Sequence, residues 1–312
     1  MLVNSMAQRK VIPQGKGGLT VYLPKSWVDK RGLKGGDLVD INEIEGDIVI
    51  GSKKSEHREY VIELTLENII LLRQILVYPY RMGFDTIVLK GECLEIIDEV
   101  QEIVTKYLLG FEVTSKSAKQ IVIESISEPD ETKFETLLRR LFLIIQEHFT
   151  VLVQSLEQGN FDAIKRVTEL NLQCDKYAYF CKRAIKKEKY TSKILIIWQL
   201  LNSLQQINHS FTYLYQDVQN TTVTNTSIFK LQLSELNKYF NSVMDGFYKK
   251  NLKLVAENYP KRNELLNKSK TQLLLDLNSS FERIFSLHLL SIIRQIAIIN
   301  VNSNIENYLE ED

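Results

Sequence analysis

The 312-residue chain has few of the residues on which disulfide-rich and many-stranded proteins depend, with three cysteines, five prolines and thirteen glycines. An odd cysteine count without C-x-x-C spacing argues against a disulfide framework and against a cysteine-ligated zinc site. Cys174 and Cys181 lie seven positions apart, so on a helix they share one face, and we expect both to be buried. The scarcity of proline and glycine favours long helices over a many-stranded sandwich.

A signal peptide and a membrane span are also missing from the pattern. The N-terminal MLVNSMAQRK has no apolar h-region. The most apolar stretch, residues 286–301, is interrupted by His288 and Arg294, so we expect no membrane insertion. The sequence therefore predicts a soluble, cytoplasmic protein.

Charge of one sign is absent overall, because 39 basic residues balance 39 acidic ones. Neutrality argues against a nucleic-acid-binding protein only if the charge is spread evenly along the chain. Residues 1–34 contain seven basic residues and a single acid, Asp29, whereas residues 35–47 contain five acids. The overall balance therefore conceals a local basic segment of the kind that phosphate binding requires.

The hydrophobic fraction (44%) and charged fraction (25%) are those of a globular protein, and the length allows two or three domains. Residues 1–55 hold eight of the thirteen glycines together with short β-type runs, which predicts a small β domain. A short helix, ended by Gly32, is expected at residues 25–31. The β-type runs are residues 9–13, 19–24, 37–44 and 47–52.

Residues 56–128 alternate between strand and helix patterns, which predicts a small α/β domain in the middle of the chain. Thr65 is placed to cap one helix and Gly110 to end another. The helices are expected at residues 66–82 and 92–110, and the strands at residues 60–66, 85–90, 111–117 and 119–126.

Residues 129–312 show the helical period throughout, which predicts an all-α domain. The polar run 219–227 reads as a linker and divides the region into two three-helix bundles, residues 129–219 and 226–312. The six helices are expected at residues 134–156, 164–185, 197–214, 228–248, 251–270 and 274–309.

Two motifs carry a resemblance in the first domain: T-V-Y-L-P-K-S-W at residues 20–27 and G-L-K-G-G-D at residues 32–37. With the glycine turn at residues 15–18, they resemble the AbrB/MazE/SpoVT family of swapped-hairpin DNA-binding domains. In that family two chains exchange hairpins to form one barrel, so the resemblance implies an obligate dimer. It also implies DNA contacts from Arg9, Lys10, Lys16, Lys25, Arg31 and Lys34. On the alternative interpretation, these are solvated surface charges of a dimerisation module.

The helical region resembles the PhoU family of phosphate-uptake regulators, which are built from two three-helix bundles. The whole chain is similar to archaeal-type members that carry an AbrB-like head, an α/β middle and a PhoU-like tail. The matching stretches are residues 80–87, 108–113, 138–140 and 177–183. The resemblance implies contacts with phosphate transporter components or a signalling kinase.

PhoU proteins often hold iron or zinc clusters on E/D-x-x-x-D pairs, and those positions are degraded in this sequence. The first pair reads Asn171 and Asp175, and the second reads Gln205 and His209. In the second bundle, Asn263 and Asn267 fall near the matching place, and residues 296–300 contain no acid. A multinuclear site is therefore doubtful, and no cofactor is assigned. Asp175 and His209 stay open as ligands of one metal ion or as partners in an interhelical hydrogen bond.

The sequence shows no group of residues spaced as a catalytic site would require. No serine sits in a nucleophile elbow and no local spacing pairs a cysteine with a histidine. His148 and His288 lie on apolar helical stripes, where a buried histidine with a hydrogen-bond partner is expected, and His57 is expected to be exposed.

Two functional hypotheses follow. In the first, the protein is a dimeric, non-enzymatic transcriptional regulator whose head binds DNA and whose helical tail relays phosphate status. In the second, it is a cytoplasmic signalling adaptor of phosphate transport, whose head dimerises the chain without binding DNA. The operator, the effector and the direction of regulation are left open by the sequence.

Overall fold

The structure is a computed structural model that describes residues 8–15, 17–44, 46–51, 57–187, 194–274 and 279–309. It divides into two compact units, which are described separately below. The head unit is Met1–His57 and the main unit is Arg58–Asp312. The described residues are mostly helical, with small β-sheets confined to the N-terminal part of the chain.

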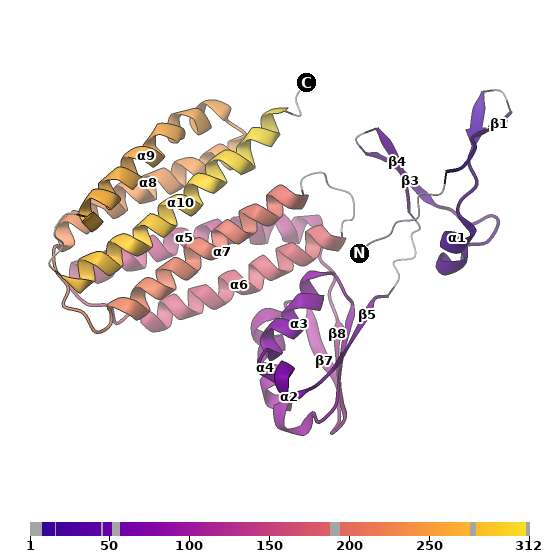
Figure 1. Ribbon diagram of the computed structural model, residues 1–312, viewed down its shortest axis with the longest axis horizontal. Coiled ribbons are helices and arrows are strands. Elements are labelled where there is room, and N and C mark those ends of the chain that lie inside the picture. Colours follow the sequence, from indigo (N-terminus) through magenta and orange to yellow (C-terminus); the bar gives the residue numbers. More distant parts are fainter. Residues whose placement is uncertain are drawn as a thin grey trace. The chain divides into compact units, whose positions relative to one another are not determined.

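The described residues of the head unit form two antiparallel two-stranded sheets and one short helix (Figure 1). Strands β1 (Ile12–Gln14) and β2 (Gly18–Thr20) form the first sheet, and β3 (Asp40–Ile44) and β4 (Asp47–Gly51) form the second. Helix α1 spans Lys25–Arg31 and ends at Gly32, which adopts the left-handed conformation (φ 59°), as the sequence predicted. The first two strands are shorter than expected, because a two-stranded ribbon gains little from further pairing without a core to pack against.

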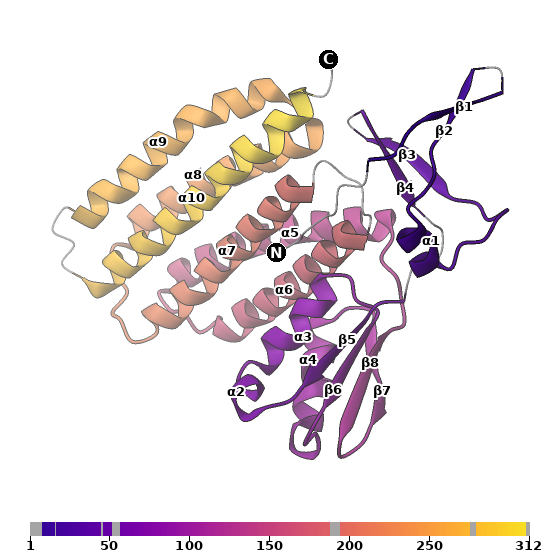
Figure 2. The same ribbon diagram turned by 45° about the vertical axis from the view of Figure 1, so that its right-hand side comes forward.

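A four-stranded mixed sheet opens the main unit, in the order β5-β6-β8-β7. Its strands are β5 (Glu59–Glu63), β6 (Thr86–Lys90), β7 (Phe111–Lys116) and β8 (Gln120–Ser125); β5 and β6 are parallel and the other pairs antiparallel. Helices α3 (Leu72–Arg81) and α4 (Ile97–Tyr107) cover one face of this sheet (Figures 1 and 2). Apolar residues of both helices and of that sheet face form one core.

The expected single helix over residues 66–82 is wrong, because the chain forms two helices there. Helix α2 spans only Leu66–Ile69, and α3 begins at Leu72. Thr65 and Asn68 form a capping box, and the Asn68 amide also donates to the backbone oxygen of Glu63 (2.9 Å). These side-chain bonds fix the start of α2 at Leu66, and a turn at residues 70–71 separates α2 from α3. The second expected helix likewise starts late, with a short 3-10 turn, η1 (Leu94–Ile96), before α4.

Six long helices fill the rest of the main unit, and they share one continuous apolar core. The first three are α5 (Glu131–Gln158), α6 (Ile164–Lys187) and α7 (Ile194–Val218). The second three are α8 (Thr226–Lys249), α9 (Leu252–Leu274) and α10 (Ser280–Leu309). Helices α7 and α10 lie side by side and join the two sets (Figures 1 and 2). Cys174 and Cys181 are both buried in this core, as predicted.

The polar run between the two sets is shorter than the sequence suggested. Helix α8 already begins at Thr226, and Val223 packs against the core. The Thr224 hydroxyl and the Asn225 amide both donate to Glu282 Oε1, so this connection is tied to α10. Residues 275–278, where part of the sixth expected helix falls, lie outside the described residues.

The sequence led us to expect no segment that could span a membrane, but one helix meets the criteria of length and composition. Within the described residues, Ser280–Asn302 is long and apolar enough to cross a membrane by length and composition, with a mean hydropathy of 1.7. In the structure, 61% of the 18-residue apolar window within this helix is buried, because the helix packs against α7, α8 and α9. Such burial is typical of the central helix of a bundle.

Candidate functional site

The predicted DNA-contact residues of the head unit are spread over its N-terminal half. Arg9 and Lys10 precede β1, while Lys25 opens α1. These three side chains and that of Lys34 are exposed. Arg31 is half-buried, and its guanidinium lies 5.8 Å from the centroid of the Trp27 ring. Lys16 lies outside the described residues.

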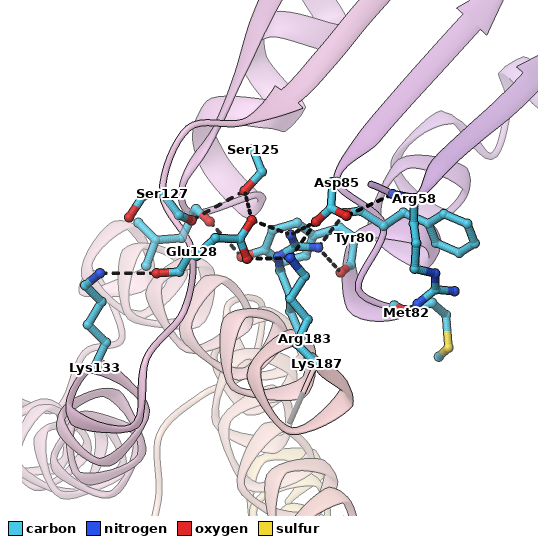
Figure 3. A network of polar contacts seen from close by, with 12 residues as sticks. Arg58, Tyr80, Met82, Asp85, Ser125, Ser127, Glu128, Lys133, Arg183 and Lys187 are labelled. Atoms are coloured by element: carbon cyan, nitrogen blue, oxygen red, sulfur yellow. Dashed lines mark hydrogen bonds and ion pairs between the residues drawn. The ribbon is translucent and has the colours of Figure 1, made fainter. Parts of the chain in front are cut away.

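In the main unit, four charged residues meet where the sheet joins the helices, and we call them the ionic network: Asp85, Glu128, Arg183 and Lys187 (Figure 3). Asp85 ends the turn that leads into β6, and Glu128 follows β8. Arg183 and Lys187 are four residues apart on α6, so they project from one face of that helix.

Arg183 is the most deeply buried member, with 1% of its surface exposed. Its guanidinium lies 3.2 Å from Asp85 Oδ1 and donates to the backbone oxygens of Tyr80 (3.3 Å) and Phe84. The Phe111 ring centroid is 4.7 Å from the guanidinium carbon. These contacts replace the water that the buried cation loses.

Asp85 receives several donors at once. Lys187 Nζ donates to Oδ1, and the backbone N–H of Arg58 donates to Oδ2 at 3.0 Å. Burial alone would raise the pKa of Asp85, but the bonds from Lys187 and Arg58 and the charge of Arg183 outweigh it and hold the pKa below its usual value. The carboxylate is therefore ionised at neutral pH and can bind both cations.

The ionic network also holds the first residue of the main unit. Besides its backbone bonds to Asp85, Arg58 donates from Nη1 to the backbone oxygen of Met82 (2.9 Å), and its guanidinium carbon lies 4.2 Å from the Phe84 ring centroid. Arg58 directly follows the head unit in sequence and precedes β5. The Asp85 carboxylate therefore binds both helix α6 and the residue just before β5 (Figure 3).

The two candidate metal ligands form an interhelical hydrogen bond between α6 and α7. Asp175 Oδ1 accepts from His209 Nε2 (3.1 Å) and from Gln205 Nε2 (2.6 Å). Among the described residues, no three His, Cys, Asp or Glu side chains lie close enough together to hold a metal ion. The Gln205 side chain donates an amide N–H to the Asp175 carboxylate at a position where the E/D-x-x-x-D pattern of PhoU proteins has a carboxylate. These residues therefore do not fit a multinuclear metal cluster.

A second hydrogen-bonded chain crosses the same helices one turn away. His148 Nε2 lies 2.6 Å from Asn208 Oδ1, and the Asn208 amide donates to Asn171 Oδ1. The His148 ring stacks on Phe211, as expected for a core histidine with a partner. Burial lowers the pKa of His148 to about 4, so the ring is neutral at physiological pH. His288 also has its expected partner, Asp217 Oδ2, at 2.9 Å.

In the second set of helices, the asparagines that the sequence placed near the matching position, Asn263 and Asn267, are exposed on α9. The buried Asn258 of the same helix has its Nδ2 3.5 Å from Oδ1 of the buried Asn300. The core-facing side of α9 therefore carries Asn258 and Leu265, and not the asparagines at 263 and 267.

Sequence reasoning missed the ionic network altogether. A partial signal was available, since Asp85 in the stretch 80–87 and Arg183 in the stretch 177–183 are opposite charges with apolar neighbours. Paired charges of opposite sign in two such stretches indicate a buried ion pair, but not which residues join it.

No family model matches this chain, and neither the curated proteins nor the solved structures give a match to it.

Proposed function

We propose that this protein is a dimeric transcriptional regulator, in which two head units bind DNA and the main unit relays phosphate status to them. One observation carries the DNA-binding part. The described basic side chains of residues 8–34 are exposed or half-buried, and Asp29 is the one acid in that stretch. Such a segment can approach the phosphates of a duplex without strong repulsion.

The state of the apolar side chains supports dimerisation. Among the head residues whose side chains the structure describes, none is buried, and Leu38 has 86% of its surface exposed. A β unit of about 50 residues has too little core to be stable alone. A second head unit can supply the missing core, in line with the swapped-hairpin resemblance of residues 20–37.

The ionic network supports the relay. Asp85 binds the first residue of the main unit and two cations of α6, so a shift of α6 alters the support of the segment that leads to the head unit. The phosphate part of the proposal rests on the resemblance of residues 177–183 to PhoU proteins.

The test replaces Arg9, Lys10, Lys16 and Lys25 by alanine and measures retention on duplex DNA of mixed sequence. We expect retention to be lost while the dimer persists, since phosphate contacts depend on these charges. If two chains supply six to ten phosphate contacts, the affinity of the wild type falls about 10³–10⁵-fold between roughly 50 and 200 mM salt.

The matched control removes the same charge from exposed positions of the main unit, through alanine at Lys116, Arg139, Arg140 and Lys165. This control variant should bind DNA like the wild type. Equal retention by the head variant and the wild type would contradict DNA binding by the head and favour the adaptor hypothesis, in which the head only dimerises the chain.

A further inference from the structure

A second buried cation of α6 lies next to the ionic network and has no carboxylate partner. Lys182 precedes Arg183 and has 2% of its surface exposed. Its Nζ donates to Asn202 Oδ1 (2.8 Å) and Gln205 Oε1, which are neutral amide oxygens. No ion pair to Lys182 is found among the described residues. A buried ammonium with neutral acceptors alone retains much of its desolvation cost.

Arg81, the last residue of α3, lies beside Lys182. Its guanidinium carbon is 5.5 Å from the centroid of the Tyr179 ring, and Lys182 Nζ is 6.0 Å from the same centroid. The Trp198 ring centroid is 5.5 Å from Lys182 Nζ. The Nε of Arg81 is buried without a hydrogen-bond partner, and within the described part of the chain the residue forms no ion pair.

Asp175, the carboxylate whose charge acts on Lys182, already has other partners. Its Oδ1 accepts from Gln205 and His209. Burial, together with the charge of Arg81, lowers the pKa of Lys182 to about 8 in spite of Asp175. The lysine is thus still largely protonated near neutral pH, in a place that holds an excess of positive charge.

The same place is rich in donors and poor in acceptors. Burial raises the pKa of Tyr179 to about 12, so its hydroxyl keeps its proton, and no hydrogen bond of that hydroxyl is found among the described residues. Arg81, Tyr179, Trp198 and Asn202 are half-buried, so the group extends from the buried ammonium to the surface.

We propose that Lys182 and Arg81, with Tyr179 and Trp198 beside them, form a binding site for a small oxyanion such as phosphate, sulfate or a carboxylate. A bound oxyanion would accept from Arg81 Nε and from Lys182, and would supply the negative charge that the group lacks. Because Lys182 has only 2% of its surface exposed, the group favours a small ion over a nucleic acid or a peptide.

The site is placed to act on the ionic network. Arg81 lies between Tyr80 and Met82, whose backbone oxygens accept from Arg183 and Arg58, and Lys182 directly precedes Arg183. A role of the oxyanion as effector of the regulator rests on the proposed function. Binding of the oxyanion to this site is independent of the proposed function, and it can be tested without DNA.

The experiment measures the affinity and the melting temperature of the full-length protein with potassium phosphate, sodium sulfate or sodium acetate, at an ionic strength kept constant with sodium chloride. A ligand that binds the folded state raises the melting temperature. We expect at least one oxyanion to do so beyond chloride, and the most effective of the three identifies the ion.

Lys182→Met and Arg81→Gln should each weaken that binding about tenfold or more, the loss expected for one charge-assisted contact. Lys165→Met, an exposed lysine on the same helix, should bind like the wild type. Lys182→Met removes a buried charge that has no carboxylate partner among the described residues, so the variant should remain folded. Its melting temperature without oxyanion is the check on folding.

The proposal is overturned if no oxyanion exceeds chloride in the wild type, or if Lys182→Met responds as strongly as the wild type. The head variant without Arg9, Lys10, Lys16 and Lys25 should still bind the oxyanion. Loss of DNA binding with intact oxyanion binding therefore separates the failure of one proposal from that of the other.

Discussion

The head unit and the main unit place their apolar side chains in opposite ways. In the main unit, apolar residues gather into two buried clusters, one beneath the sheet and one shared by six helices. In the described part of the head unit, eight large apolar side chains are exposed: Val11, Ile12, Leu19, Val21, Tyr22, Leu38, Ile41 and Ile48.

Size and sheet geometry explain this difference. The main unit has enough residues to surround a core, whereas two separate two-stranded ribbons have no layer to pack against. Each large apolar side chain that becomes fully buried contributes about 1.5–3 kcal/mol. The head unit thus gains the most from association with a second copy, and the main unit has less need of it.

The largest expected effect is the loss of the dimer when charges are placed among the exposed apolar side chains of the head unit. Tyr22→Asp combined with Leu38→Asp places two charges among the exposed apolar side chains of the head unit. We expect the dimer to dissociate, because a charge cannot enter the apolar interface without a partner. Sedimentation analysis of the full-length protein measures the mass.

The control is Leu66→Asp with Ile70→Asp, two apolar residues of the main unit that are equally exposed, at 84% and 83%. This variant should stay dimeric. A head variant that remains dimeric would show that the exposed apolar residues of the head do not form the interface.

A smaller effect sharpens the comparison from the other side, by testing what supports the main unit. Asp85→Asn removes the carboxylate that binds the buried Arg183 and the half-buried Lys187, and leaves the more exposed Glu128 as their acidic partner. The free energy of unfolding of the main unit should fall by about 3 kcal/mol, the lower end of the loss for a broken buried pair. Urea unfolding followed by circular dichroism measures it. Asp98→Asn, an exposed acid on α4, should change it by about 0.5 kcal/mol or less.

The smallest effect concerns the pH dependence of that stability. His148 has its pKa lowered to about 4 by burial, whereas the unfolded chain binds the proton near the usual value of 6.5. The unfolded state therefore binds more protons between these values, and stability is lost as the pH falls from 6.5 to about 4. The loss is at most about 3.5 kcal/mol, at about 1.4 kcal/mol per pKa unit.

His148→Gln keeps a donor for Asn208 but does not titrate, so its stability should change less over that pH range. His57→Gln, which removes an exposed histidine, should keep the acid sensitivity of the wild type. Equal acid sensitivity in His148→Gln and the wild type would mean that other groups carry the pH dependence.

Long periodic segments were predictable from the sequence, and short local features were not. The six helices of the main unit follow from apolar residues that recur at the helical period, and Gly32 marks the end of α1. The turn between α2 and α3 falls inside the apolar run of residues 69–72, which hydrophobic periodicity reads as part of one helix.

The candidate site was predictable only in part. Of the two interpretations that the sequence left open for Asp175 and His209, the structure shows the interhelical hydrogen bond. The ionic network depends on residues about 100 positions apart, such as Asp85 and Arg183, and one sequence does not show which distant charges meet. The uncompensated charge of Lys182 is visible only when its neutral neighbours are known.

The central claim is that two chains together complete the head unit, and the mass of the full-length wild-type protein in solution tests it most directly. Sedimentation equilibrium at micromolar concentration should give twice the chain mass of 36.2 kDa. A mass of one chain under the same conditions would contradict the account, because the apolar side chains of the head would then stay exposed without a partner.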